Sequence, residues 1–227
     1  MVVFNDVLVP WDRVLLLEDG ERANNINEAT DAVVFMAEQA TVREIAKAEF
    51  FLGLTTLIAE TIGADQFAHV QEKIAEVMMT VETMKAFLIS GEVNAKVNKW
   101  GVMTPDYVPL NSARNLWPRA SPMLATVVKQ VAAGGLIANP PGAIMDSEIR
   151  PDVDKYFQSK LGSADERLKI FKLAWDAVGS SFGGRQELYE RYFFGDPVRM
   201  ASAYYNWYDK APYKQRVREF LERKDGS

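Results

Sequence analysis

One stretch of this chain limits its possible folds more than any other. Apolar residues recur at alternating steps of three and four positions from Phe67 to Leu88. The members of this series are Phe67, Val70, Ile74, Val77, Val81, Met84 and Leu88. Because an α-helix has 3.6 residues per turn, this spacing puts them all on one helix face, which must be buried against other helices. The series therefore predicts a long amphipathic helix that packs in a bundle.

A second long helix is expected immediately before this one, from Ala29 to Ile62, with Gly63 as its stop signal. The residues that share one face of it are Ala37, Thr41, Ile45, Ala48 and Leu52. We expect Asp65 to cap the following helix, which Gly101 and Pro105 would end. Because only a few residues join the two helices, they must run antiparallel, which is how a helix bundle begins.

The middle of the chain contains several breaking residues. Three prolines occur between Thr104 and Pro118, so this range is predicted to be a loop. A third helix is expected from Pro118 to about Leu136, perturbed by the pair Gly134-Gly135. A firm break follows at residues 139–142, which read Asn-Pro-Pro-Gly.

Capping patterns locate the helices in the last third of the chain. Ser163 and Glu166 have the spacing of a capping box, and Gly179 would close the helix that follows. Asp196 before Pro197 is an N-cap followed by a proline in the first turn. The pair Gly183-Gly184 is expected to interrupt the chain once more. The remaining helices are predicted at residues 185–194, 197–207 and 213–223.

The opening of the chain, from Val2 to Pro10, is the one segment with β character. A single strand is not stable without partners. Either this segment pairs with a part of the protein outside this sequence, or it lies as an extended arm on the helices. The rest of the chain predicts an all-α fold.

The composition excludes several kinds of site and partner. The chain has no cysteine, which rules out disulfide bonds, thiolate zinc sites and cysteine-ligated iron–sulfur clusters. One histidine, His69, leaves little scope for a metal site or a histidine-based triad. A net charge of −5 argues against a nucleic-acid partner. No apolar run suits a membrane span and no signal peptide is recognisable, so we expect no membrane partner and a cytoplasmic location.

The segment Ser180-Ser181-Phe182-Gly183-Gly184-Arg185 is the most informative candidate for a binding site. Adjacent glycines let the backbone approach a ligand closely, and serines with exposed amides can serve phosphate oxygens. Arg185 offers a bidentate partner for phosphate. The alternative is a glycine that ends the preceding helix, followed by a tight turn with no ligand.

Other polar and aromatic groups allow both a functional and a structural interpretation. His69 is either a base or hydrogen-bond donor near a cofactor, or a helix-start histidine bonded to a neighbouring group. The charged residues in the range 187–191 form either surface ion pairs or a subunit contact. An aromatic group favours core packing and an oligomer interface over a cofactor site. Its members are Tyr192, Phe193, Phe194, Tyr204, Tyr205, Trp207 and Tyr208.

Three stretches resemble one known family of flavin-dependent enzymes. Phe182–Arg191, together with Gly195-Asp196-Pro197, is similar to the C-terminal signature of the 4-hydroxyphenylacetate 3-hydroxylase oxygenase family. The opening Phe4–Val14 resembles the passage from that family's middle β-domain to its C-terminal bundle, and His69–Glu76 resembles its second bundle helix. Together these stretches span the chain from end to end.

The resemblance implies an all-α fold, the C-terminal helical bundle of the acyl-CoA dehydrogenase type. Residues 23–227 would form this bundle, and residues 1–22 an extended segment that leaves a middle β-domain absent from this sequence. Met1 in front of a mid-protein sequence implies a separated piece of a longer protein. The lack of cysteine argues against the related 4-hydroxybutyryl-CoA dehydratases, which need an iron–sulfur cluster.

In function, the resemblance implies the C-terminal domain of a two-component flavin monooxygenase that hydroxylates a phenol ortho to its hydroxyl group. A separate NAD(P)H-dependent reductase would supply reduced FAD, and the bundles would assemble a tetramer. The domain would form the oligomer interface and one wall of the flavin site, with Ser180–Arg185 and His69 as cofactor-binding residues. By itself it would be inactive. The alternative is a purely structural helical assembly module without cofactor contact.

Overall fold

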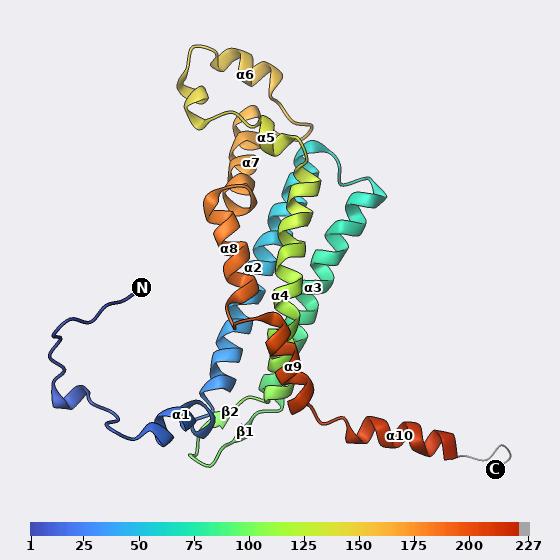
Figure 1. The fold of residues 1–227 in the computed structure, drawn as a ribbon. Helices are drawn as coiled ribbons and strands as arrows, with labels where there is room; N and C mark the ends of the chain where they lie inside the picture. The colour runs from blue at the N-terminus through green and yellow to red at the C-terminus, as the bar shows by residue number, and fades with distance from the viewer. Residues whose placement is uncertain (223–227) are drawn as a thin grey trace.

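Three long helices lie side by side at the centre of the molecule: α2 (Ala32–Ile62), α3 (Ala68–Val93) and α4 (Tyr107–Ala132) (Figure 1). The computed structural model describes residues 1–222. α7 (Ala164–Val178) packs against α2 and α4, while α8 (Ser181–Tyr192) packs against α4 and α7. The predicted bundle, with α2 and α3 antiparallel, is therefore confirmed.

Shorter elements connect and flank these helices. The remaining α-helices are α1 (Gly20–Ala29), α5 (Gly135–Ala138), α6 (Arg150–Tyr156), α9 (Pro197–Trp207) and α10 (Ala211–Glu222). Two 3-10 helices are η1 (Trp11–Arg13) and η2 (Gly142–Asp146). The strands β1 (Lys96–Val97) and β2 (Met103–Thr104) pair antiparallel between α3 and α4. None of the helices in residues 1–222 combines the length and apolar character that crossing a membrane requires.

The apolar series on α3 is buried in its middle, as its spacing predicted, but Phe67 at its start is exposed and Leu88 at its end is only partly buried. Its buried members are Val70, Ile74, Val77, Val81 and Met84, and they join the core formed with α2 and α4. Both predicted boundaries of this helix are wrong. Phe67 occupies the N-cap position, while Asp65 only accepts a hydrogen bond, through its backbone carbonyl, from Gln71 at 3.0 Å. The helix ends at Val93, before Gly101 and Pro105, because the chain turns into the β1–β2 hairpin there.

The loop predicted between Thr104 and Pro118 is instead helical from Tyr107 onward, as the first half of α4. The Asp106 side chain caps this helix by accepting a hydrogen bond from the Val108 amide at 3.0 Å. Pro118 lies inside the helix, where each proline costs about 3 kcal/mol relative to alanine. α4 buries Trp117 and other residues of the same helix face. We attribute the stability of α4 to this burial.

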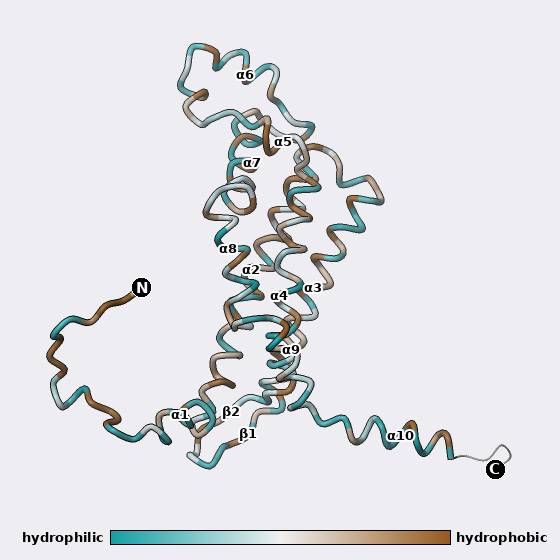
Figure 2. Tube along the Cα trace, in the orientation of Figure 1, coloured by the Kyte–Doolittle hydropathy of each residue, from teal (hydrophilic) through white to brown (hydrophobic). Residues whose placement is uncertain are grey.

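Both ends of the described chain project away from the bundle as arms (Figure 1). The first ten residues are exposed and no strand is described in them, so the idea that they lie on the helices is wrong. Figure 2 shows that hydrophobic residues occur along this N-terminal arm. The first α-helix, α1, begins at Gly20, within the range 1–22 that was expected to be extended. At the other end α10 is confirmed up to Glu222, and Arg223 with the tail to Ser227 lies outside the described residues.

The junction between α7 and α8 corrects another prediction. The capping box of Ser163 and Glu166 and the closure of α7 at Gly179 are both confirmed. The chain is not interrupted at Gly183-Gly184, however, because both glycines belong to the first turns of α8. A Cβ atom on Gly183 would lie 2.6 Å from the Ala177 carbonyl oxygen, so only glycine fits there. A Cβ atom on Gly184 would meet nothing within 4 Å.

These two glycines form a matched pair for a stability test. We expect Gly183→Ala to lower the free energy of unfolding by about 1–3 kcal/mol, because the new methyl group clashes with the end of α7. Gly184→Ala should leave it unchanged or raise it by up to about 1 kcal/mol, because alanine favours helix. Urea denaturation of both variants measures this difference. Equal effects of the two substitutions would contradict the close contact at Gly183.

Candidate functional site

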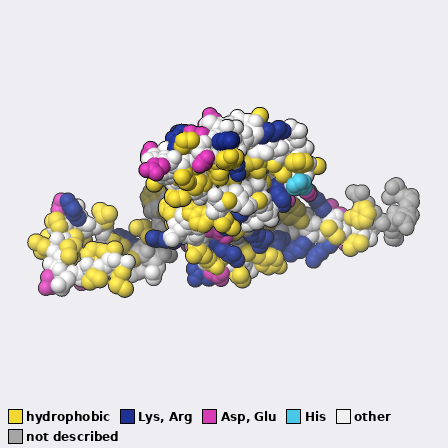
Figure 3. All heavy atoms as spheres, turned by 90° about the horizontal axis from the view of Figure 1, so that it is seen from above, with side chains coloured by type: hydrophobic (Ala, Val, Ile, Leu, Met, Phe, Trp, Pro, Cys, Tyr) yellow, Lys and Arg dark blue, Asp and Glu magenta, His cyan; other side chains and the backbone are white. Residues whose placement is uncertain are grey.

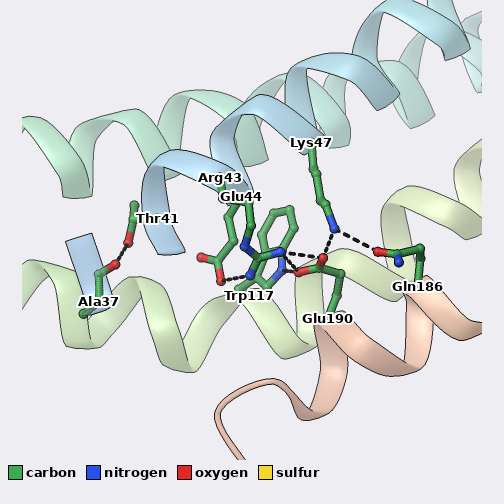
Figure 4. A network of polar contacts seen from close by, with 8 residues as sticks. All are labelled: Ala37, Thr41, Arg43, Glu44, Lys47, Trp117, Gln186 and Glu190. Carbon is green, nitrogen blue, oxygen red and sulfur yellow. Dashed lines mark hydrogen bonds and ion pairs between the residues drawn. The ribbon is translucent and has the colours of Figure 1, made fainter. Parts of the chain in front are cut away.

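A buried carboxylate on α8 holds this helix to α2 and α4 (Figure 4). Glu190 is only 6% exposed, and Arg43 Nη1 on α2 donates to both of its oxygens, at 2.6 and 2.8 Å. The Trp117 indole nitrogen on α4 donates to it at 2.8 Å. Lys47, one turn after Arg43, pairs with the same carboxylate and also donates to Gln186 at 3.1 Å. The Glu190 carboxylate thus links side chains of three helices, α2, α4 and α8.

A second acid lies beside this network in a different protonation state. Glu44 is fully buried on α2, and burial raises its pKa to about 8, although Arg43 acts to lower this pKa. Burial on its own would raise the pKa of Glu190 as well, but hydrogen bonds from Arg43, Lys47 and Trp117 hold that pKa below its ordinary value. At neutral pH Glu190 is therefore charged while Glu44 carries a proton.

The predicted surface ion pairs in the range 187–191 are confirmed for Glu187, which pairs with Lys129 at 3.4 Å, but not for Glu190. Glu190 belongs to neither a surface ion pair nor a subunit contact, because its partners come from inside the same bundle. Local sequence could not reveal this, since Arg43 and Glu190 are 147 positions apart. Glu44 did leave a signal: it continues the alternating four- and three-residue spacing of Ala37 and Thr41 on the buried face of α2. A charged residue in such a series points to a buried polar network.

An apolar cavity of about 150 Å³ opens between α2, α4 and the start of α8. Its apolar walls come from Phe50, Phe51, Ala125, Ala177 and Phe182. Its polar groups come from Lys47, Trp117, Ser121, Gln186, Glu187 and Glu190, so the Glu190 network forms one side of it. Such a cavity can receive a planar apolar group and present a few hydrogen-bonding groups around it.

Ser121 is the polar residue of this cavity without an internal partner. The side chain is 7% exposed, and its hydroxyl makes no hydrogen bond within the described residues. Buried polar groups normally have a partner, because an unsatisfied one costs about 1–3 kcal/mol. A ligand in the cavity is one way to supply it. The sequence gives no signal for Ser121, which resembles any other serine on a helix.

The structure places part of the predicted segment 180–185 at this cavity. Phe182 and Gly183 line it, as does Gln186 one turn later. Ser180 is the N-cap of α8, and its hydroxyl accepts a hydrogen bond from the Gly183 amide at 3.1 Å. Ser181 is exposed at the first position of the helix. The turn therefore faces a cavity, and it is also a helix cap.

The other predicted residues do not line the cavity. Gly184 and Arg185 are exposed on a neighbouring face of α8, and no hydrogen bond of the Arg185 side chain is described. His69 is exposed at the start of α3, where its ring stacks on Phe67 with centroids 5.8 Å apart. Within residues 1–222, no group of three or more histidine, aspartate or glutamate residues is arranged to hold a metal ion.

The central position of Glu190 can be tested against a neighbour on the same helix. Glu190→Ala should lower the free energy of unfolding by about 3–5 kcal/mol, because it leaves Arg43 and Lys47 without their buried partner. Glu187→Ala removes an exposed ion pair with Lys129 and should cost at most about 1 kcal/mol. Chemical denaturation measures both. Similar losses for the two variants would show that the buried network is not the main attachment of α8.

Known proteins resemble this chain over nearly its whole length. The model of the family described as 4-hydroxyphenylacetate 3-hydroxylase C terminal matches residues 23–222. The 4-hydroxyphenylacetate 3-monooxygenase oxygenase component of Thermus thermophilus is 48% identical over 98% of this chain and 46% of that protein. A crystal structure of such an oxygenase component with FAD and 4-hydroxyphenylacetate is also 48% identical, has a TM-score of 0.91, and matches 97% of this chain and 46% of that one.

A more distant likeness concerns the fold alone. A 4-hydroxybutyryl-CoA dehydratase from N. maritimus is 18% identical and has a TM-score of 0.72, covering 86% of this chain and 40% of that one. The all-α, acyl-CoA dehydrogenase-like bundle implied by the three motifs is thus confirmed. This chain spans about half the length of the curated relatives it matches. The chain belongs to the 4-hydroxyphenylacetate 3-hydroxylase family, of which it comprises the C-terminal domain.

Proposed function

We propose that this chain is the C-terminal part of a reduced-FAD-dependent phenol ortho-hydroxylase and forms one wall of its flavin site. The observation that carries this proposal is the cavity beside Phe182 and Gly183, in a chain 48% identical to an oxygenase component whose crystal structure contains FAD and 4-hydroxyphenylacetate. The remaining walls would come from parts of the protein outside this sequence. A phenol and an NAD(P)H-dependent flavin reductase would be its other partners.

The residues at the start of α8 fit part of a flavin. Phe182, with Phe50 and Phe51, offers apolar surface for a planar ring, and the unpartnered Ser121 hydroxyl offers a hydrogen bond at the floor. The N-terminal amides of α8 and the exposed Arg185 guanidinium suit an anionic diphosphate. Reduced FAD, when bound, would supply the electrons and the activation of oxygen. This domain's residues would hold the cofactor and exclude water from its ring.

The position of Gly184 supports a close approach at the helix start. A Cβ atom on Gly184 would meet no other part of the described chain within 4 Å, so a ligand or another part of the enzyme can approach the backbone there. His69 lies away from the cavity lining, so its cofactor role rests on the family resemblance alone. The alternative, a helical assembly module without cofactor contact, would leave the α8 start as a simple helix cap.

A chimera tests the flavin role. This chain would replace the matching C-terminal part of the Thermus thermophilus oxygenase component, and reduced FAD would be titrated anaerobically. Arg185→Ala removes a charge-assisted hydrogen bond worth about 1.5–3 kcal/mol, so we expect about ten- to hundred-fold weaker binding. Gly184→Val should also weaken binding, by obstructing the backbone. Arg191→Ala, an exposed arginine at the other end of α8, is the matched control and should bind normally.

Two outcomes would count against this role. If Arg185→Ala and Gly184→Val both bind reduced FAD as the parent chimera does, the α8 start is a helix cap and the assembly-module alternative is favoured. If the 227-residue chain alone hydroxylates phenols with reduced FAD above background, the proposal that it forms only one wall of the site is wrong.

We also propose that this chain contributes to a homo-oligomer, as a tetramer. Its support is the apolar surface left exposed on both arms, which an isolated chain of this size would not be expected to maintain. Figure 3 shows many hydrophobic side chains on the N-terminal arm, which lies to the left of the bundle in this view. The exposed residues include Phe4, Leu8, Trp11 and Leu15 on the N-terminal arm, and Val217, Phe220 and Leu221 on α10.

Light scattering at micromolar concentration measures this assembly. We expect a mass above that of one chain. Replacing Phe220 and Leu221 by serine should shift the population towards the monomer, because both side chains are more than two-thirds exposed in the isolated chain. A matched change at the exposed polar residues Lys214 and Gln215 should have no effect. A strict monomer over the whole concentration range would contradict the proposal.

A further inference from the structure

A second pocket, separate from the cavity beside Phe182 and Gly183, lies between α4 and α9. It has a volume of about 230 Å³, and its polar and aromatic lining consists of Tyr107, Asn111, Arg114, Asn115, Tyr204 and Trp207. It shares no lining residue with the cavity beside Phe182. No acidic residue lines it, although a guanidinium group does.

Arg114 is a half-buried cation without a counter-ion. No carboxylate lies within 4.0 Å of it in the part of the chain that the structure describes. Its contacts are a hydrogen bond to the Tyr107 hydroxyl and the face of Phe194, whose centroid is 4.4 Å away. Its Nε atom is buried and makes no hydrogen bond within residues 1–222.

The buried acid Glu44 does not neutralise this charge. It forms no ion pair with Arg114 within 4.0 Å, and burial raises the pKa of Glu44 to about 8, although the charge of Arg114 acts to lower it. Glu44 therefore remains protonated at neutral pH. A partly buried cation without an anion is unfavourable, so the pocket is electrostatically prepared for an anionic ligand.

Neighbouring residues add an amide group and an aromatic wall to the pocket. Asn111 is only 7% exposed, and its oxygen lies 3.4 Å from the Asn115 amide nitrogen, which leaves its own amide nitrogen without a described acceptor. Trp207 packs edge-on against Tyr107, with ring centroids 5.2 Å apart. The Tyr204 hydroxyl is held by the Ser112 hydroxyl at 2.8 Å.

From these contacts we propose that the α4–α9 pocket binds a small aromatic carboxylate. The carboxylate would pair with Arg114 and accept a hydrogen bond from Asn111. The ring would lie against the aromatic wall of Tyr107 and Trp207. A charged head beside a flat apolar body matches the two halves of the lining, which neither a simple anion nor a neutral ring would do. This site is independent of the proposed flavin wall.

Isothermal titration of the 227-residue chain with three probes tests the chemistry. Phenylacetate carries both ring and carboxylate, 2-phenylethanol keeps the ring without the charge, and acetate keeps the charge without the ring. We expect phenylacetate to bind at least ten-fold more tightly than either of the others. If 2-phenylethanol binds as tightly as phenylacetate, Arg114 does not recognise the ligand. If acetate binds as tightly as phenylacetate, the aromatic wall does not contribute to binding.

Variants locate the site. Arg114→Gln should weaken phenylacetate binding at least ten-fold, while Arg119→Gln, an exposed arginine on the same helix, should leave it unchanged. Because Arg114 also contacts Tyr107 and Phe194, thermal melts must show that the variant is folded. Asn111→Asp is the second test: it supplies an internal carboxylate beside Arg114, so binding should be lost while the melting temperature is kept. Undetectable binding to the parent chain, or unchanged affinity in a folded Arg114→Gln or Asn111→Asp variant, would overturn the proposal.

Discussion

The ionised carboxylate of Glu190 is the interaction on which the arrangement of α8 depends. A charge at this depth is tolerated only because Arg43, Lys47 and Trp117 satisfy it together. Those three donors come from α2 and α4, so they restrict where α8 can pack along the bundle. Gly183 imposes the second constraint, by letting the start of α8 lie against the end of α7. The helix is thereby held near both of its ends.

The cavity beside Phe182 and Gly183 is a consequence of these two attachments. α8 reaches the bundle core at Glu190 and α7 at Gly183, and the space between them is lined by small side chains such as Ala125 and Ala177. These small side chains leave the cavity open, and the aromatic rings of Phe50 and Phe182 form part of its wall. A cavity that is bounded by a rigid ion network and a helix junction keeps its shape without a ligand, which favours binding because little order has to be created.

Within residues 1–222, α4 lines both pockets and has more buried residues than any other helix, and it also contains the residues least suited to a helix. Pro118 and Pro122 each remove a backbone hydrogen bond in its interior. Local propensity therefore favoured a loop where tertiary packing stabilises a helix. Trp117 illustrates the difference. It precedes Pro118, so local sequence predicts that a helix does not pass through it, yet it lies inside α4, is 1% exposed and donates a hydrogen bond to Glu190.

Local sequence patterns were enough to predict the helix bundle, the buried apolar series on α3, the caps at Ser163 and Asp196, and the family, because each of these depends on residues close together in the chain. Phe182 and Gly183, two of the candidate binding residues predicted from the sequence, line the cavity, but no local pattern pointed to Ser121 or Lys47, which line it as well. Packing between distant helices explains why α8 continues through its glycines and why α4 continues through its prolines. It also explains why Glu190 is buried and charged while Glu44 is buried and protonated. Burial and ion pairing are set by side chains that come together from helices far apart in the chain, and their energies outweigh local backbone preferences.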